Sequence, residues 1–158
     1  MAKSKKNIVD PESMIKIYGA DAVRWFILSD SPPDKDVQWS NQGVNASYKF
    51  LQKIWNLNLN ILDHVNAKRV KTLEEEFNDQ FNSYILKITN LIENFQLNVA
   101  VANVYELVNF LQKIIDNKTA SKKNLVDSFK KFSLIIHPFI PHLSEEIWKE
   151  LQLPNLVI

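Results

Sequence analysis

The 158-residue sequence contains no cysteine and only two glycines. Without cysteine, neither a disulfide framework nor a thiolate metal site can form. Hairpin turns and phosphate-binding loops depend on glycine, so the chain has little material for either. No apolar run approaches the ~20 residues that cross a bilayer, and nothing resembles a signal peptide. These absences favour a soluble helical domain, for which we expect a cytoplasmic location and no membrane partner.

An excess of either charge is also missing. The 19 Lys and Arg residues face 18 Asp and Glu residues, which gives a formal net charge of +1. Many dedicated nucleic-acid-binding proteins are far more basic. If this chain binds RNA, local basic patches must provide the attraction, because the overall field is close to neutral. Composition alone therefore leans slightly against RNA binding.

Hydrophobic residues recur at three- and four-residue steps from about Ser40 onward, which predicts amphipathic helices. Four or five such helices with short links predict an all-α fold, an antiparallel helical bundle over residues 40–158. For residues 1–39 we expect a loop and a small helix-rich adaptor segment before the bundle. The most regular apolar stripe of the chain contains Phe77, Phe81, Tyr84, Ile85, Ile88, Leu91, Ile92 and Phe95.

Residues suited to capping mark the expected helix boundaries. Asp10, followed by Pro11, is typical of a helix start, and Gly19 is a natural stop. We further expect Ser40 and Asn98 to cap later helices. Connecting segments are predicted at residues 29–39, with a brief extended piece over Val37–Trp39, at residues 66–72 and at residues 116–123.

The N-terminal string from Met1 to Pro11, continued by Tyr18-Gly-Ala-Asp-Ala-Val-Arg24, resembles the Lys-Met-Ser-Lys-Ser signature loop of class I aminoacyl-tRNA synthetases and the helix pair after it. Lys3 matches the second lysine of that loop and Ser4 its last serine. The first lysine is missing, and Ala2 stands where the family has serine. The resemblance implies that Lys3 and Ser4 contact ATP.

Elementary chemistry agrees with this role. Pyrophosphate leaves when ATP activates a carboxylate, and a closing loop that carries an ammonium group can stabilise the charge that builds on the phosphates. The plain alternative is a solvated run of lysines. This alternative would mean that the match of the following residues to the same family, in the same alignment, is a coincidence.

A second string, residues 137–148, resembles the segment that closes the anticodon-binding helical domain in the synthetases for leucine, valine, isoleucine and methionine. Its two histidines and two glutamates would suit a metal ion. However, two prolines separate the histidines, and the helical His-Glu-x-x-His arrangement is absent, so we expect no metal site. We expect the prolines to fix a turn and Phe139, Ile140 and Trp148 to pack.

A third string, Ser31-Pro-Pro followed by Trp39-Ser40 and Gly43-Val44, is similar to a passage of the leucyl-tRNA synthetases. Valyl and isoleucyl relatives usually differ around the Trp-Ser pair. The resemblance covers Met1 to about Leu151. It implies an enzyme that activates leucine with ATP and Mg²⁺ and transfers it to tRNA(Leu). Since the chain begins inside the signature loop, we expect the nucleotide-binding fold to precede it, and we expect the chain alone to bind no cofactor and to catalyse no aminoacylation.

The role expected for the chain alone is to dock the stem of tRNA(Leu), as a monomer, with contacts mainly to phosphate and sugar. Trp55 and Tyr105 could stack on RNA, although core packing suits both better. Two alternatives stay open: the same domain of a valyl- or isoleucyl-tRNA synthetase, and a free-standing helical module that binds protein. For each candidate phosphate contact, the plain alternative is an ordinary solvated side chain. The candidates are Arg24, Lys49, Lys53, Lys113, Lys118, Lys122 and Lys123.

Overall fold

The computed structural model describes residues 9–63 and 71–151, with the backbone alone at residues 71 and 72. Within these ranges the chain forms seven α-helices and no β-strand, which confirms the expected all-α class. None of the described helices is long and apolar enough to span a membrane. The helices are α1 (Pro11–Tyr18), α2 (Ala20–Asp30), α3 (Asn41–Leu62), α4 (Lys71–Glu93), α5 (Leu97–Asn117), α6 (Lys122–Ile136) and α7 (Pro141–Glu150).

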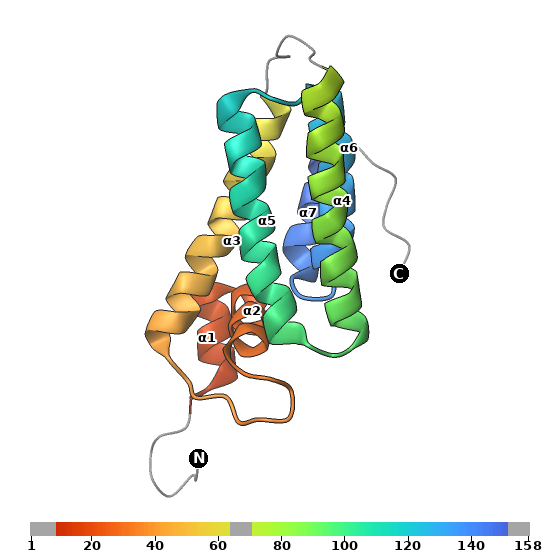
Figure 1. The fold of residues 1–158 in the computed structure, drawn as a ribbon. Helices are drawn as coiled ribbons and strands as arrows, with labels where there is room; N and C mark the ends of the chain where they lie inside the picture. Colours follow the sequence, from red (N-terminus) through yellow and green to blue (C-terminus); the bar gives the residue numbers. More distant parts are fainter. Residues whose placement is uncertain (1–8, 64–70, 152–158) are drawn as a thin grey trace, which may run out of the picture.

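The five later helices lie along one long axis, and each reverses the direction of the one before it (Figure 1). α5 packs against α2, α3 and α4, while α6 packs against α3, α4 and α7. The two short helices α1 and α2 lie across the end of the bundle at which α3 begins (Figure 1). The structure therefore confirms an antiparallel bundle preceded by a small helical segment.

The apolar stripes of these helices meet in one core. Burial of each large aliphatic or aromatic side chain stabilises the fold by roughly 1.5–3 kcal/mol, and this term holds the long helices together. The core extends into the N-terminal segment, because Trp25 of α2 is fully buried in the same cluster. The largest fully buried side chains are Trp25, Ile54, Leu57, Ile61, Phe77, Phe81, Ile88, Leu107, Leu111, Phe129, Phe132 and Phe139.

Three of the four expected boundary residues are confirmed. Asp10 caps α1 by accepting hydrogen bonds from the backbone N–H groups of Glu12 (3.3 Å) and Ser13 (3.1 Å). The hydrogen bonds from the hydroxyl and backbone N–H of Ser13 hold the pKa of Asp10 below its ordinary value. Gly19 ends α1 with φ of +82°, a conformation that L side chains rarely adopt. Ser40 caps α3.

The fourth expected boundary residue is wrong. Asn98 lies inside the first turn of α5, and the residue that precedes the helix is Gln96, which offers no side-chain cap. The turn is instead closed by backbone hydrogen bonds, such as that from Gln96 N to the carbonyl of Leu91 (2.8 Å). Phe95 sits in this turn with φ of +56° and is 72% exposed, so its place on the buried stripe is also wrong.

Two predicted connections differ from the observed ones. The connection expected over residues 29–39 begins at Ser31, because α2 continues to Asp30. The loop expected over residues 116–123 is reduced to residues 118–121, because α5 continues to Asn117 and α6 begins at Lys122. Lys118 ends α5 in the left-handed conformation, and the Ser121 hydroxyl caps α6 by accepting from Asn124 N (3.3 Å). These local hydrogen bonds satisfy the helix ends and shorten the connection.

A smaller cluster fastens the start of α3 to α2. Phe26 is 4% exposed and packs with Val23, Val44 and Trp39; the ring centroids of Phe26 and Trp39 are 5.4 Å apart. A β-carbon at Gly43 would lie 2.5 Å from Cε2 of Phe26. Glycine at this position therefore allows α3 to approach the buried ring.

Gly43→Ala should destabilise the protein, although alanine is the better helix former by about 1 kcal/mol. Because neighbouring side chains confine Phe26, overpacking should lower the free energy of unfolding by about 1–3 kcal/mol. Urea denaturation measures the change. Ala46→Gly, at an exposed position of the same helix, is the control and should cost about 1 kcal/mol through helix propensity alone. A Gly43→Ala protein more stable than the starting protein would contradict this account of the contact.

Candidate nucleic-acid interface

The N-terminal string and the string at residues 137–148 meet in the structure, although more than a hundred residues separate them. Asp21 of α2 accepts a hydrogen bond from the backbone N–H of Leu143 at the start of α7 (2.7 Å). The second carboxylate oxygen lies 2.8 Å from Nδ1 of His142. Asp21 is 7% exposed, so these two contacts stand in for the water that a buried carboxylate would otherwise need.

Asp21 caps the N-terminus of α7, which the residue before the helix cannot cap. The residue before α7 is Ile140, whose side chain cannot accept a hydrogen bond, and Pro141 occupies the first helical position. The remaining N–H groups of the first turn need an acceptor, and the positive end of the helix favours a negative charge. The carboxylate of α2 supplies both, and it acts as a tertiary N-cap.

Arg24 fastens the turn before α7 from the same helix. Its Nε donates to the carbonyl of Phe139 (3.2 Å), and one of its terminal nitrogens donates to the carbonyl of Pro138 (2.7 Å). Arg24 is one of the predicted phosphate contacts, and the structure places it here as a clamp on the backbone. Two of its five N–H donors are used in this way.

Aromatic packing completes the junction behind these polar contacts. The indole N–H of Trp25 donates to the hydroxyl of Tyr105 (3.0 Å), and the Trp25 ring meets the Phe139 ring edge-on at 5.9 Å. Burial raises the pKa of the Tyr105 hydroxyl, so the neutral form is favoured. The Tyr105 ring also lies 3.8 Å from that of Phe50. Tyr105 therefore takes part in core packing, the role that the sequence favoured over stacking on RNA.

The histidines of the second string have separate partners. His142 faces Asp21, whereas Nε2 of His137 lies 3.4 Å from a carboxylate oxygen of Glu145. Among the described residues, no group of three or more His, Cys, Asp or Glu side chains is placed to hold a metal ion.

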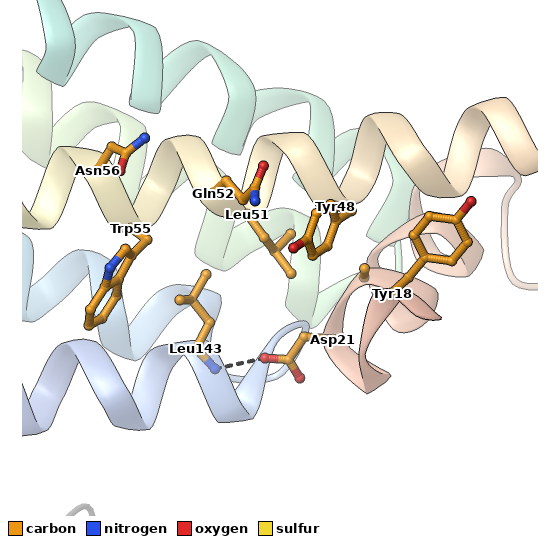
Figure 2. Close-up of a pocket in the computed structure, with 9 residues that line it drawn as sticks. Tyr18, Asp21, Tyr48, Leu51, Gln52, Trp55, Asn56 and Leu143 are labelled. Carbon is orange, nitrogen blue, oxygen red and sulfur yellow. Dashed lines mark hydrogen bonds between the residues drawn. The ribbon is translucent and has the colours of Figure 1, made fainter. Parts of the chain in front are cut away.

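A groove of about 420 Å³ opens beside the junction, between α3 and the starts of α2 and α7 (Figure 2). Trp55 stands at one end of it and Tyr18 and Tyr48 at the other, with Leu51 between them (Figure 2). Asp21 and Leu143 form the side opposite α3. The complete lining is Tyr18, Asp21, Ala22, Tyr48, Leu51, Gln52, Trp55, Asn56 and Leu143.

Three of the predicted lysines lie on α3, which lines this groove, and on α5, which packs against α3. Lys49 and Lys53 are exposed and one turn apart on α3. Lys53 donates to the side-chain carbonyl of Asn109 on α5 (2.7 Å), and Lys113 follows Asn109 by one turn of α5. The structure thus brings Lys49, Lys53 and Lys113 to one face, which we call the α3–α5 face.

The other three predicted lysines gather at the opposite end of the bundle, around the α5–α6 connection. Lys118 ends α5, and the ammonium of Lys122 donates to the carbonyl of Leu62 at the end of α3. Lys123 lines a small polar hollow of about 200 Å³ together with Glu74 and Asp127, whose carboxylates oppose its charge. The seven predicted cations therefore occupy three places. Lys3 and Ser4 lie outside the described residues.

Sequence reasoning missed Asp21 as a cap and missed the groove. The string that contains Asp21 was visible, but its partner on α7 is more than a hundred residues away. Trp55 was singled out for its ring, whereas Gln52 and Asn56 were not singled out. Their spacing with Tyr48 and Trp55 on one helical face could have indicated a shared surface.

Comparison with known proteins gives two family matches and many relatives. A family model described as the anticodon-binding domain of tRNA ligase matches residues 74–158, and one described as class I tRNA synthetases (I, L, M and V) matches residues 1–40. The leucine–tRNA ligase of Maricaulis maris is 37% identical over 163 residues, which cover 100% of the chain and 19% of that protein. That of Thermotoga maritima is 36% identical over 168 residues, which cover 100% of the chain and 20% of that protein.

A solved structure matches almost the whole chain. It is the ternary complex of an Agrobacterium radiobacter K84 LeuRS with tRNA and LeuAMS, at a TM-score of 0.87 and 27% identity, over 99% of the chain and 21% of that protein. The chain therefore spans about a fifth of the length of the relatives it matches. These matches confirm the synthetase resemblance, and they favour neither the valyl or isoleucyl alternative nor the free-standing module.

Asp21→Ala should lower the free energy of unfolding by about 2 kcal/mol, because it removes a cap and leaves the partly buried backbone N–H of Leu143 without its acceptor. Asp21→Asn keeps one carbonyl acceptor and should cost less. Asp79→Ala, at an exposed position of α4, is the matched control and should change the stability by less than about 0.5 kcal/mol. Equal losses for Asp21→Ala and Asp79→Ala in urea denaturation would refute the tertiary cap.

Proposed function

The chain belongs to the family of anticodon-binding domains of tRNA ligases, and from that premise we propose that it is the tRNA-docking part of a leucine–tRNA ligase. The whole enzyme would join leucine to tRNA(Leu) at the expense of ATP in the cytoplasm. The curated relatives named above, all leucine–tRNA ligases, support leucine as the amino acid. The solved relative is a LeuRS held with tRNA, which supports tRNA as the partner.

The observation that carries the proposal is the junction between the two matched segments. Asp21 and Arg24 belong to the N-terminal string, and both are bonded to the segment at the start of α7. A tRNA docked on the bundle would then have a fixed position relative to α1 and α2. In this proposal residues 1–39 are the adaptor and residues 40–158 the tRNA-binding domain.

The ATP-contacting role belongs to Lys3 and Ser4 in this proposal. A lysine ammonium and a hydroxyl donor suit the phosphates of ATP, which the whole enzyme would bind with Mg²⁺. Support for this assignment comes from the family match over residues 1–40.

The α3–α5 face is the surface that we propose for the phosphates of the tRNA stem. Lys49, Lys53 and Lys113 are exposed there on two adjacent helices. Ammonium groups at the ends of flexible stems bind phosphates as point charges and do not require base-specific geometry. Because the net charge is only +1, the attraction must come from such a local group.

Binding of the purified chain to a tRNA(Leu) transcript should fall steeply as salt rises, since phosphate contacts release counterions. The triple variant Lys49→Ala, Lys53→Ala, Lys113→Ala should bind more weakly and lose about three units of the slope of log K against log salt. A control with Lys16, Lys87 and Lys149 changed to alanine removes the same charge from other helices and should keep most of the slope.

Two outcomes would contradict the proposal. Absence of tRNA binding at low salt would remove the docking function and favour a module that binds protein. Equal affinity for tRNA(Leu), tRNA(Val) and tRNA(Ile) would leave docking in place and remove the amino-acid assignment.

A further inference from the structure

The groove beside the junction has the form of a slot for a flat aromatic group. Tyr48 and Trp55 are seven residues apart on α3, which places them on the same face and about 10 Å apart along the helix axis. Leu51 lies between them, so the two end walls are aromatic and the floor is aliphatic (Figure 2). Tyr18 widens one wall, its ring centroid 6.2 Å from that of Tyr48 in an edge-on arrangement.

Hydrogen-bonding groups surround this apolar slot. The side-chain amides of Gln52 and Asn56 are on exposed positions of α3 at its upper edge (Figure 2). Each amide offers two N–H donors and one carbonyl acceptor, the combination that base edges require. On the opposite side lies the buried carboxylate of Asp21, whose oxygens keep acceptor capacity beyond the Leu143 and His142 contacts. An apolar slot bordered by a few polar groups is typical of a ligand site.

Positive and negative charge lie on opposite sides of the groove. Lys49 follows Tyr48 on α3 and is exposed on the side of Gln52 and Asn56. Asp21 is negative and closes the α2 side. An occupant with a flat aromatic part and a neighbouring negative charge would therefore place that charge toward α3 and its aromatic part inside the slot. A nucleotide in an RNA chain has this distribution.

We propose that the groove formed by Tyr18, Tyr48, Leu51 and Trp55 receives one unstacked base of the bound tRNA, with its phosphate toward Lys49. The inference rests on the proposed tRNA-docking function and adds a site for a single base to it. Proteins often read RNA through unpaired bases that stack on aromatic side chains. Gln52 and Asn56 then meet the base edge, while the rest of the α3–α5 face meets phosphates.

The test is nucleotide-resolution footprinting of tRNA(Leu) in complex with the full chain. Dimethyl sulfate and carbodiimide report the Watson–Crick edges of the bases, and hydroxyl radicals report the backbone. We expect a backbone footprint and, within or beside it, one unpaired base whose edge becomes protected. In the double variant Gln52→Ala, Asn56→Ala, which changes exposed residues only, the backbone footprint should remain and the protection of that base should disappear.

Trp55→Leu tests the stacking wall and keeps an aliphatic contact at a half-buried position. It should weaken tRNA binding about tenfold, as expected for the loss of one base–aromatic stack. Asn60→Ala, one turn beyond Asn56 on α3 and outside the groove lining, is the matched control and should keep both the affinity and the base protection. A thermal melt of each variant confirms that it is folded.

The failures are distinguishable. A backbone footprint without a protected base, or with a protection that survives the double variant, would overturn the base site and leave tRNA docking intact. Absence of any footprint would overturn tRNA docking and the base site together.

Discussion

The carboxylate of Asp21 at the start of α7 is the contact on which the arrangement of this protein depends. Helix α7 begins at Pro141 and follows Ile140, and neither residue can cap the helix or neutralise its positive end. A residue of α2 performs both tasks from the other end of the sequence. Since Asp21 is 7% exposed, its charge is not balanced by water, and the contact is satisfied only when α2 and α7 are held together.

The groove is a consequence of that contact. Asp21, the acceptor of the cap, and Leu143, its donor, form one side of the groove, while α3 forms the other. Arg24 and Trp25, which follow on α2, fix the turn and the core behind it. The same few residues that join the short helices to the bundle therefore define the shape of the hollow between them. Stability and the candidate binding site are coupled at this junction.

The arrangement of charge explains how a nearly neutral chain can still suit RNA. Three lysines stand on the α3–α5 face, while Lys122 and Arg24 are engaged with backbone carbonyls and Lys123 has acidic neighbours. A lysine in the sequence is thus an incomplete guide to a phosphate contact, because part of the positive charge serves the fold. What remains is local, and local charge is what steers phosphate.

The sequence by itself determined the helices, because period and capping are local properties: Asp10 and Ser40 start helices and Gly19 ends one through contacts within four residues. It also determined the family, because the strings that resemble the synthetases are short stretches of sequence and can be recognised without the fold. It failed at Asn98 and Phe95, where backbone hydrogen bonds closed the turn without the expected side chain. Only the tertiary structure decided that Asp21 caps α7, that Arg24 clamps a turn, and which side chains line the groove. These contacts depend on how helices that are far apart in the sequence pack together, and a local sequence pattern does not specify that packing.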